Sequence, residues 1–80
     1  MTNLERYKKI FMETFDITEA QLDGLQYQGI SEWDSVGHMT LISKLEDAFE
    51  IMMDTDDIID LSSFEIGMDI LGKYNIEFKK

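Results

Sequence analysis

One serine stands at the start of a strongly patterned segment, in the run Trp33-Asp34-Ser35-Val36. Asp34 is a favourable N-cap residue, because its carboxylate can accept hydrogen bonds from unpaired N–H groups in the first helical turn. Ser35 would then lie in that first turn, beside free N–H groups and the positive end of the helix dipole. A phosphate ester on the Ser35 oxygen would be stabilised there by electrostatics. The spacing therefore suits a serine that carries a phosphate-linked group.

The segment that follows Ser35 has the periodicity of an amphipathic helix. Its apolar residues recur at steps of three and four, and three more widen the stripe: Val36, Met39, Ile42, Leu45 and Phe49, then Leu41, Ala48 and Ile51. We predict a helix from about Ser35 to Glu50. The plainer alternative is that Asp34 and Ser35 only cap this helix, which is the usual role of such a pair at a helix start.

Two catalytic or metal-binding readings of the same region are weaker. His38 lies three residues after Ser35, on the same helix face, but a serine hydrolase also needs a group that orients the imidazole and an oxyanion site. We therefore expect no enzyme activity, and an exposed or rim position for His38. A calcium loop at Asp54, Asp56 and Asp57 would need further oxygen ligands where residues 58 and 59 are isoleucine, so we expect no metal site.

The negative charge of the chain is concentrated around and after the serine. Eleven acidic residues lie between Glu32 and Asp69 against the single base Lys44, which accounts for the whole net charge of -10. Such a field attracts basic partner surfaces and repels nucleic acid. The alternative is an acidic face that serves solubility only.

The residues before Trp33 predict one helix and one long connection. Thr2-x-x-Glu5 forms a capping box for a helix that extends to about Phe15. From Asp16 to Trp33 we predict a partly ordered loop, with a short helical turn after Thr18-x-x-Gln21. The apolar residues expected to hold this loop on the core are Ile17, Leu22, Leu25 and Ile30.

Two further helices follow the central one. Acidic residues crowd the first turn of a short helix that begins near Asp54 and continues through Leu61. Ser62-x-x-Glu65 predicts a second capping box and a last helix that ends between Gly72 and Asn75. The sequence thus predicts an all-α four-helix bundle with three longer helices and one short third helix.

Length and composition limit the setting of the protein. The 80 residues form one domain in our interpretation, and so small a domain has little room for an internal active-site cavity. The chain has no cysteine, no apolar run of the roughly 18 residues that span a bilayer, and no signal-peptide core at its start. We expect a cytoplasmic monomer without a transmembrane segment.

The motif and its surroundings resemble the acyl carrier protein family. The resemblance covers Asp34-Ser35-Val36, the run Leu45-Glu46-Asp47-Ala48-Phe49, and the later Asp54-Thr55-Asp56-Asp57-Ile58-Ile59-Asp60 and Phe64-Glu65-Ile66. It implies a bundle of acyl-carrier type in which a phosphopantetheinyl transferase esterifies Ser35 with 4′-phosphopantetheine from coenzyme A. The thiol of that group would hold acyl intermediates as thioesters for loading and processing enzymes. Asp34 would match the aspartate that supports metal-assisted transfer, and the partner-binding residues would be Val36, Met39, Glu46, Asp47, Asp56 and Asp57.

Three positions depart from the family pattern. Val36 replaces the usual leucine, Gly37 stands where a polar or acidic residue is common, and Trp33 stands where many fatty-acid carriers have a small or apolar residue. We interpret Gly37 as a tolerated residue. We expect the three departures to alter the surface around the attached arm, and we interpret them together as a sign of a specialised pathway in place of housekeeping fatty-acid biosynthesis. Two alternatives remain open: an aminoacyl or peptidyl carrier, and an unmodified acidic helical adaptor for basic partners.

Overall fold

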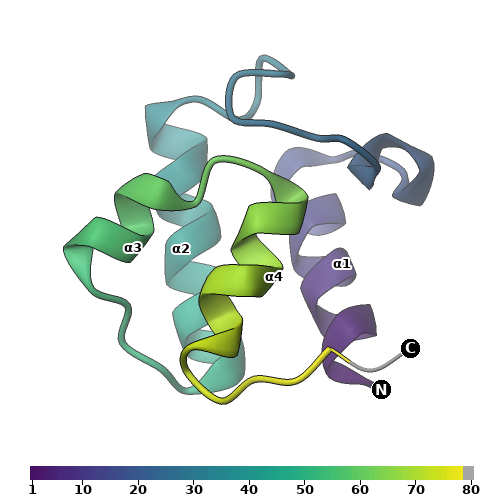
Figure 1. Cartoon of the computed structure of the whole chain (residues 1–80). Coiled ribbons are helices and arrows are strands. Elements are labelled where there is room, and N and C mark those ends of the chain that lie inside the picture. Colours follow the sequence, from purple (N-terminus) through teal and green to yellow (C-terminus); the bar gives the residue numbers. More distant parts are fainter. Residues whose placement is uncertain (79–80) are drawn as a thin grey trace.

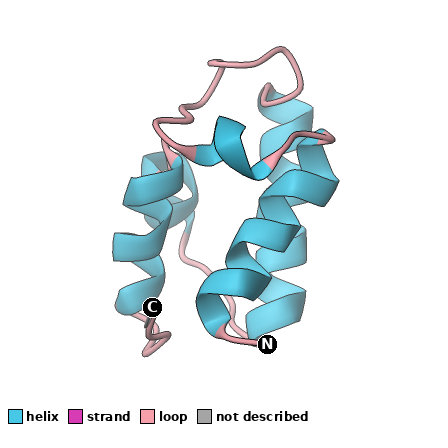
Figure 2. Cartoon of the chain, turned by 90° about the vertical axis from the view of Figure 1, so that its right-hand side faces the viewer, coloured by secondary structure: helices cyan, strands magenta, loops and turns pink. Residues whose placement is uncertain are grey.

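The computed structural model describes residues 1–78 and confirms the all-α fold (Figure 1). Its elements are α1 (Asn3–Phe15), a 3-10 turn η1 (Glu19–Leu22), α2 (Ser35–Phe49), α3 (Thr55–Asp60) and α4 (Phe64–Gly72). The described residues contain no strand, only an isolated antiparallel bridge between Gln26 and Ser63. The long connection between α1 and α2 lies at one end of the bundle in both views (Figures 1 and 2).

Side-chain caps are present at the starts of α1, α2 and α4, whereas the N-cap residue of α3, Asp54, makes no side-chain capping hydrogen bond. The predicted box at Thr2 and Glu5 is present, with Glu5 N donating to Thr2 Oγ1 at 3.1 Å and Thr2 N donating to the Glu5 carboxylate at 3.1 Å. The box predicted at Ser62 is wrong, because Ser63 caps α4 by accepting a hydrogen bond from Ile66 N at 3.0 Å.

A tertiary contact explains that one-residue shift. The Tyr27 N–H donates to the Ser62 carbonyl at 2.9 Å, and the Phe64 N–H donates to the Leu25 carbonyl at 2.9 Å. The chain before α4 is therefore extended against the long connection, and the helix begins only where this pairing ends.

Aromatic rings fill the space between α1, α2 and α4. The Phe11 ring lies 5.1 Å from Phe64 and 5.5 Å from Trp33, while Phe15 stacks on Trp33 at 5.4 Å. Tyr7 is fully buried and donates a 2.8 Å hydrogen bond to the Phe64 carbonyl. Burial raises the pKa of Tyr7 well above its ordinary value, so its hydroxyl remains a neutral donor. The rings therefore pack α1 against α4 and against the residue that leads into α2.

The apolar residues of the long connection hold it on this core as predicted. Leu22 and Leu25 are buried, and Ile17 and Ile30 are partly buried against the same cluster. Turn hydrogen bonds from Gly29 N to Gln26 O at 2.8 Å and from residue 33 N to Ile30 O at 3.2 Å order its second half. The connection therefore ends in a defined position, directly before α2.

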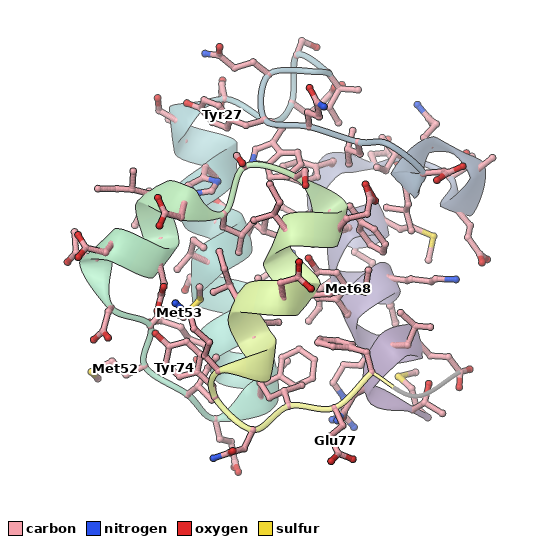
Figure 3. The ribbon with its side chains drawn as sticks, in the orientation of Figure 1. Tyr27, Met52, Met53, Met68, Tyr74 and Glu77 are labelled. Atoms are coloured by element: carbon pink, nitrogen blue, oxygen red, sulfur yellow. The ribbon has the colours of Figure 1, made fainter. Side chains whose placement is uncertain are left out.

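A buried carboxylate joins α3 to the end of α4. Asp57 is only 7% exposed, and its two oxygens accept hydrogen bonds from Lys73 Nζ and from the Tyr74 hydroxyl, the latter at 2.6 Å. The Tyr74 oxygen also accepts a hydrogen bond from Asp54 N at 3.0 Å, and Figure 3 shows Tyr74 beside the α2–α3 connection at Met53. The hydrogen bond from Lys73 lowers the pKa of Asp57 most, and the hydrogen bond from Tyr74 lowers it further. The Asp57 carboxylate therefore anchors this short helix to the end of α4.

We predict that Asp57 stabilises the fold in a pH-dependent way. Because its folded pKa is depressed, its contribution is present above the ordinary value of 3.8 and is lost as the pH falls through the lower folded value. Asp57→Asn should therefore lower the urea midpoint at about pH 6, and its difference from the native protein should shrink below about pH 4. Asp56→Asn, at the exposed neighbouring position, is the matched control and should change the midpoint little. A pH-independent difference for Asp57→Asn would contradict this role.

Candidate functional site

Ser35 is the first residue of α2, and the sequence prediction of its cap is confirmed. Asp34 Oδ1 accepts a hydrogen bond from Gly37 N at 2.8 Å, and the Asp34 carbonyl accepts one from His38 N at 2.7 Å. The N–H groups of Ser35 and Val36 belong to the first turn and have no acceptor within the helix. The Ser35 side chain is exposed next to them, so an anionic ester on its oxygen would meet a favourable field.

Gly37 has a steric role, which corrects its interpretation as a merely tolerated residue. A Cβ atom added at this position would lie 2.1 Å from the Glu32 carbonyl oxygen and 3.2 Å from the Phe15 ring. The close approach comes from the chain's own long connection. Only glycine lets that connection pass so near the first turn of α2 and deliver the cap residue Asp34.

We predict that Gly37→Ala destabilises the protein, although alanine is intrinsically the better helix former by about 1 kcal/mol. Overpacking against a backbone carbonyl should outweigh that gain and lower the free energy of unfolding by about 1–3 kcal/mol. Gly72→Ala is the matched control, because no atom lies within 4 Å of a Cβ at that helical position. Urea unfolding should show Gly72→Ala as neutral or stabilising; an equal or higher stability for Gly37→Ala would refute the steric role.

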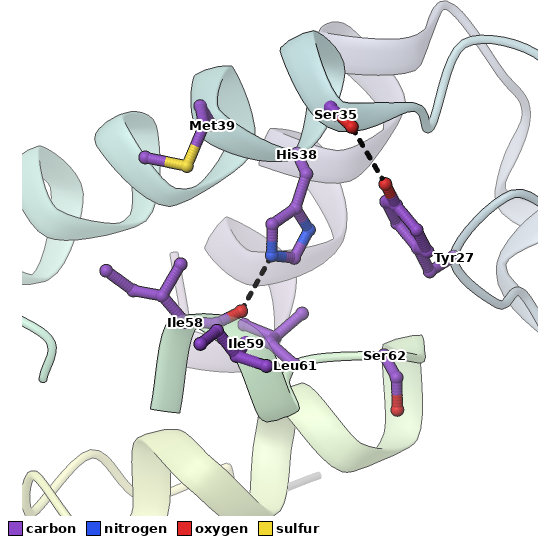
Figure 4. A pocket seen from close by; sticks show the side chains of 8 residues that line it. All are labelled: Tyr27, Ser35, His38, Met39, Ile58, Ile59, Leu61 and Ser62. Carbon is purple, nitrogen blue, oxygen red and sulfur yellow. Dashed lines mark hydrogen bonds between the residues drawn. The ribbon is translucent and has the colours of Figure 1, made fainter. Parts of the chain in front are cut away.

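Two hydrogen bonds of His38, near Ser35, connect α2 to Trp33 and to α3. The Trp33 indole donates to His38 Nδ1 at 2.9 Å, and His38 Nε2 lies 2.7 Å from the Ile58 carbonyl oxygen (Figure 4). An indole nitrogen can only donate, so Nδ1 must be the acceptor and Nε2 must carry the proton that reaches Ile58. The imidazole is therefore neutral in this arrangement and spans the gap between the two helices.

The contacts of His38 and Trp33 bear on two expectations from the sequence. His38 is half-buried, which agrees with a rim position, and both of its ring nitrogens make hydrogen bonds. The hydroxyl of Ser35 contacts Tyr27 instead, with 3.2 Å between the two oxygens, so the serine–histidine pair suggested by spacing is not formed. Trp33 is fully buried, and it therefore shapes the core below the site and not the surface around it.

Ser35 lies on the rim of a pocket between α2 and α3. The pocket has a volume of about 350 Å³, and eight residues line it: Tyr27, Ser35, His38, Met39, Ile58, Ile59, Leu61 and Ser62. Figure 4 shows Met39 and Ser35 on the α2 side, the two isoleucines on the α3 side, and Tyr27 reaching the mouth from the long connection. A second, more open hollow runs from Ser35 along α2 past Val36, Thr40 and Lys44. The serine is therefore flanked by two concave surfaces.

The surface next to Ser35 is apolar. Val36 is 76% exposed, Met39 54% and Ile59 70%. Side chains of this size are normally withdrawn from water, and exposed apolar groups gathered around one site are typical of binding surfaces. Val36 and Met39 were predicted from the sequence to meet partners, whereas Ile59 was not.

The predicted acidic partner residues separate into two kinds. Asp47 and Asp56 are exposed. Glu46 is half-buried and accepts a hydrogen bond from Met53 N at 2.9 Å, which holds the turn after α2. Asp57 is buried in its contact with α4, contrary to its assignment to the outer surface, because Lys73 and Tyr74 compete successfully with water for its carboxylate.

The sequence interpretation missed Tyr27, which is the hydrogen-bond partner of Ser35. No local signal marks Tyr27, since it lies eight residues away in an irregular segment and is positioned by its backbone bond to Ser62. Ile59 had a weak signal. Asp57 and Leu61, four residues apart, are both buried, so a helix through them turns Ile59 outward.

Comparison of the sequence with protein-family models and with curated proteins gives no match. Within residues 1–78, no three His, Cys, Asp or Glu side chains are grouped so that they could hold a metal ion. None of the helices in this range is both long and apolar enough to cross a bilayer.

Proposed function

We propose that the protein is a carrier of the acyl carrier type, which receives 4′-phosphopantetheine from coenzyme A on Ser35. When bound, that group supplies a thiol that holds acyl intermediates as thioesters. The observation that carries the proposal is the exposed Ser35 in the first turn of α2, capped by Asp34 and surrounded by exposed Val36, Met39 and Ile59. The protein itself is not a catalyst in this proposal but the substrate of a phosphopantetheinyl transferase.

The residues at the helix start fit such a modification. The Ser35 hydroxyl is exposed at the rim of two hollows, so a transferase can reach it and a linear group has room to leave it. Asp34 uses Oδ1 to accept the Gly37 N–H, and no hydrogen bond within residues 1–78 engages Oδ2. That second oxygen is available to a divalent cation brought by the transfer reaction, which is the supporting role proposed for Asp34.

The proposed partner surface consists of an apolar centre and an acidic margin. Val36, Met39 and Ile59 form the centre, and Asp47 and Asp56 contribute to the margin. A basic enzyme surface would be steered by the margin and would then bury the centre, which is how affinity and association rate are commonly divided at interfaces. Glu46 and Asp57 are left out of this surface, because their carboxylates stabilise the fold.

Fewer residues favour a specialised pathway than the sequence suggested. Trp33 is in the core and Gly37 answers a steric need, so Val36 alone among the three departures changes the exposed surface. Fatty-acid biosynthesis and a specialised pathway therefore both fit, as does an aminoacyl or peptidyl carrier, since these carriers share the attachment chemistry. The alternative from another functional class is an unmodified acidic adaptor. An adaptor would lack the added mass of phosphopantetheine that every carrier gains on modification.

We predict that coenzyme A, magnesium and a broad-specificity phosphopantetheinyl transferase add the mass of one phosphopantetheine to the protein. Ser35→Ala should abolish the addition, because it removes the acceptor oxygen. Ser43→Ala, at another exposed position on the same helix, is the matched control and should be modified like the native protein. Intact-mass spectrometry reads all three. An unchanged native mass, while a known carrier is modified in parallel, would leave the acidic adaptor as the better proposal.

We predict that the transfer rate depends on the exposed acids near α2 and α3. Asp47→Lys combined with Asp56→Lys should slow transfer onto Ser35 by about ten-fold at low salt, since steering by several charges changes association rates on that scale or more. The matched control is Glu13→Lys combined with Asp23→Lys, which changes the net charge equally at exposed positions before α2. Added salt should slow the native protein toward the rate of the double variant, because screening acts over about 8 Å at physiological ionic strength. Equal slowing by this control double variant would show that only net charge matters.

A further inference from the structure

We propose that Lys44 selects the partner enzymes of this carrier, and that an enzyme which docks along α2 places an acidic side chain against it. This inference rests on the proposed function, since the partner is an enzyme that must reach Ser35. It divides the partner surface into two parts of opposite charge: an acidic part that faces the middle of α2, and a basic part that faces the acids of α3.

The exposed face of α2 carries almost none of the negative charge of the chain. From Ser35 to Leu45 the helix contains no acidic residue. Of the two acids in its last turn, Asp47 is exposed, whereas the half-buried Glu46 accepts a hydrogen bond from the Met53 N–H within the fold. The negative field near the site therefore comes mainly from other segments, and an enzyme that lies along α2 meets no acid before Asp47.

Lys44 lies at the far end of the open hollow that begins at Ser35. The hollow is lined by Ser35, Val36, Met39, Thr40, Ser43 and Lys44. Nine residues separate the two ends, which corresponds to about 14 Å along a helix axis. The Lys44 side chain is exposed, and no hydrogen bond or ion pair within residues 1–78 engages its ammonium group. Its charge is therefore available to a group on a partner that covers the hollow.

The hollow between Ser35 and Lys44 is uncharged. Val36 and Met39 are exposed apolar side chains. The Thr40 hydroxyl donates to the Val36 carbonyl at 3.1 Å, so it is turned toward its own helix. Covering the hollow therefore removes apolar surface from water, and Lys44 is the only charged side chain among its six lining residues.

This arrangement disfavours a partner whose docking surface is basic throughout. The exposed acids Asp54, Asp56 and Asp60, at the cap and along α3, attract basic side chains, whereas Lys44 repels them. Like charges brought together weaken the wrong complex, and an acid opposite Lys44 stabilises the right one. Because the two signs lie on different helices, they also fix how a bound enzyme is rotated about Ser35.

The alternative is that Lys44 only reduces repulsion among the acids of its own chain. Its charge would then contribute to the free energy of unfolding and would not affect the approach of an enzyme. Rate and stability must therefore be measured on the same variants.

The test uses the full chain and the phosphopantetheinyl transferase in an extract of the cells from which the protein comes, with coenzyme A and magnesium added. Intact mass gives the initial rate of modification. Lys44→Glu should slow modification about ten-fold, because it places a like charge against the acid of the partner. Lys44→Arg keeps the positive charge and should rescue the rate. Lys9→Glu, at an exposed position on α1, changes the net charge by the same amount and is the matched control.

A second variant keeps the test decisive if Lys44→Glu loses its helical circular dichroism. Lys44→Gln removes the charge without adding an acid, and it should slow modification about three-fold with an unchanged urea midpoint.

Every result supports or overturns the inference. Modification of Lys44→Glu or Lys44→Gln at the native rate or faster would overturn it, since a basic surface over α2 gains from either change. Equal slowing by Lys9→Glu would also overturn it, because net charge would then be the cause. An extract that leaves the native protein unmodified, while a purified broad-specificity transferase modifies it, would overturn the inference and leave the carrier function standing. Failure of both enzymes would instead refute the proposed function.

Discussion

The arrangement of the site depends on the packing and the hydrogen bond of the buried Trp33 indole. Its ring is packed by Phe11 and Phe15 of α1, one residue before the cap of α2, so the aromatic core determines where that helix begins. Its N–H donates to His38, which in turn reaches the Ile58 carbonyl and fixes the distance between α2 and α3. A fully buried residue thus positions an exposed serine and a pocket without contacting solvent itself.

Features set by neighbouring residues could be predicted from the sequence. The caps at Thr2 and Asp34 and the extents of α1 and α2 follow from short-range hydrogen bonding and a 3.6-residue period, and the predictions agree with the structure within a residue. The predicted start of α4 is wrong by one residue, because a contact between distant residues determines it. Ser62 and Ser63 have equal capping chemistry, and only the pairing of this segment with the distant long connection decides between them.

Other features depend on atoms brought together by the whole fold, and no local pattern encodes them. Gly37 is required by a carbonyl oxygen of the preceding connection, and Tyr27 meets Ser35 only because that connection is paired with the chain before α4. The acidic segment is the clearest case. Asp56 and Asp57 are adjacent and chemically identical, yet one faces water and the other anchors α3 to α4, because Lys73 and Tyr74 lie on one side of that helix only.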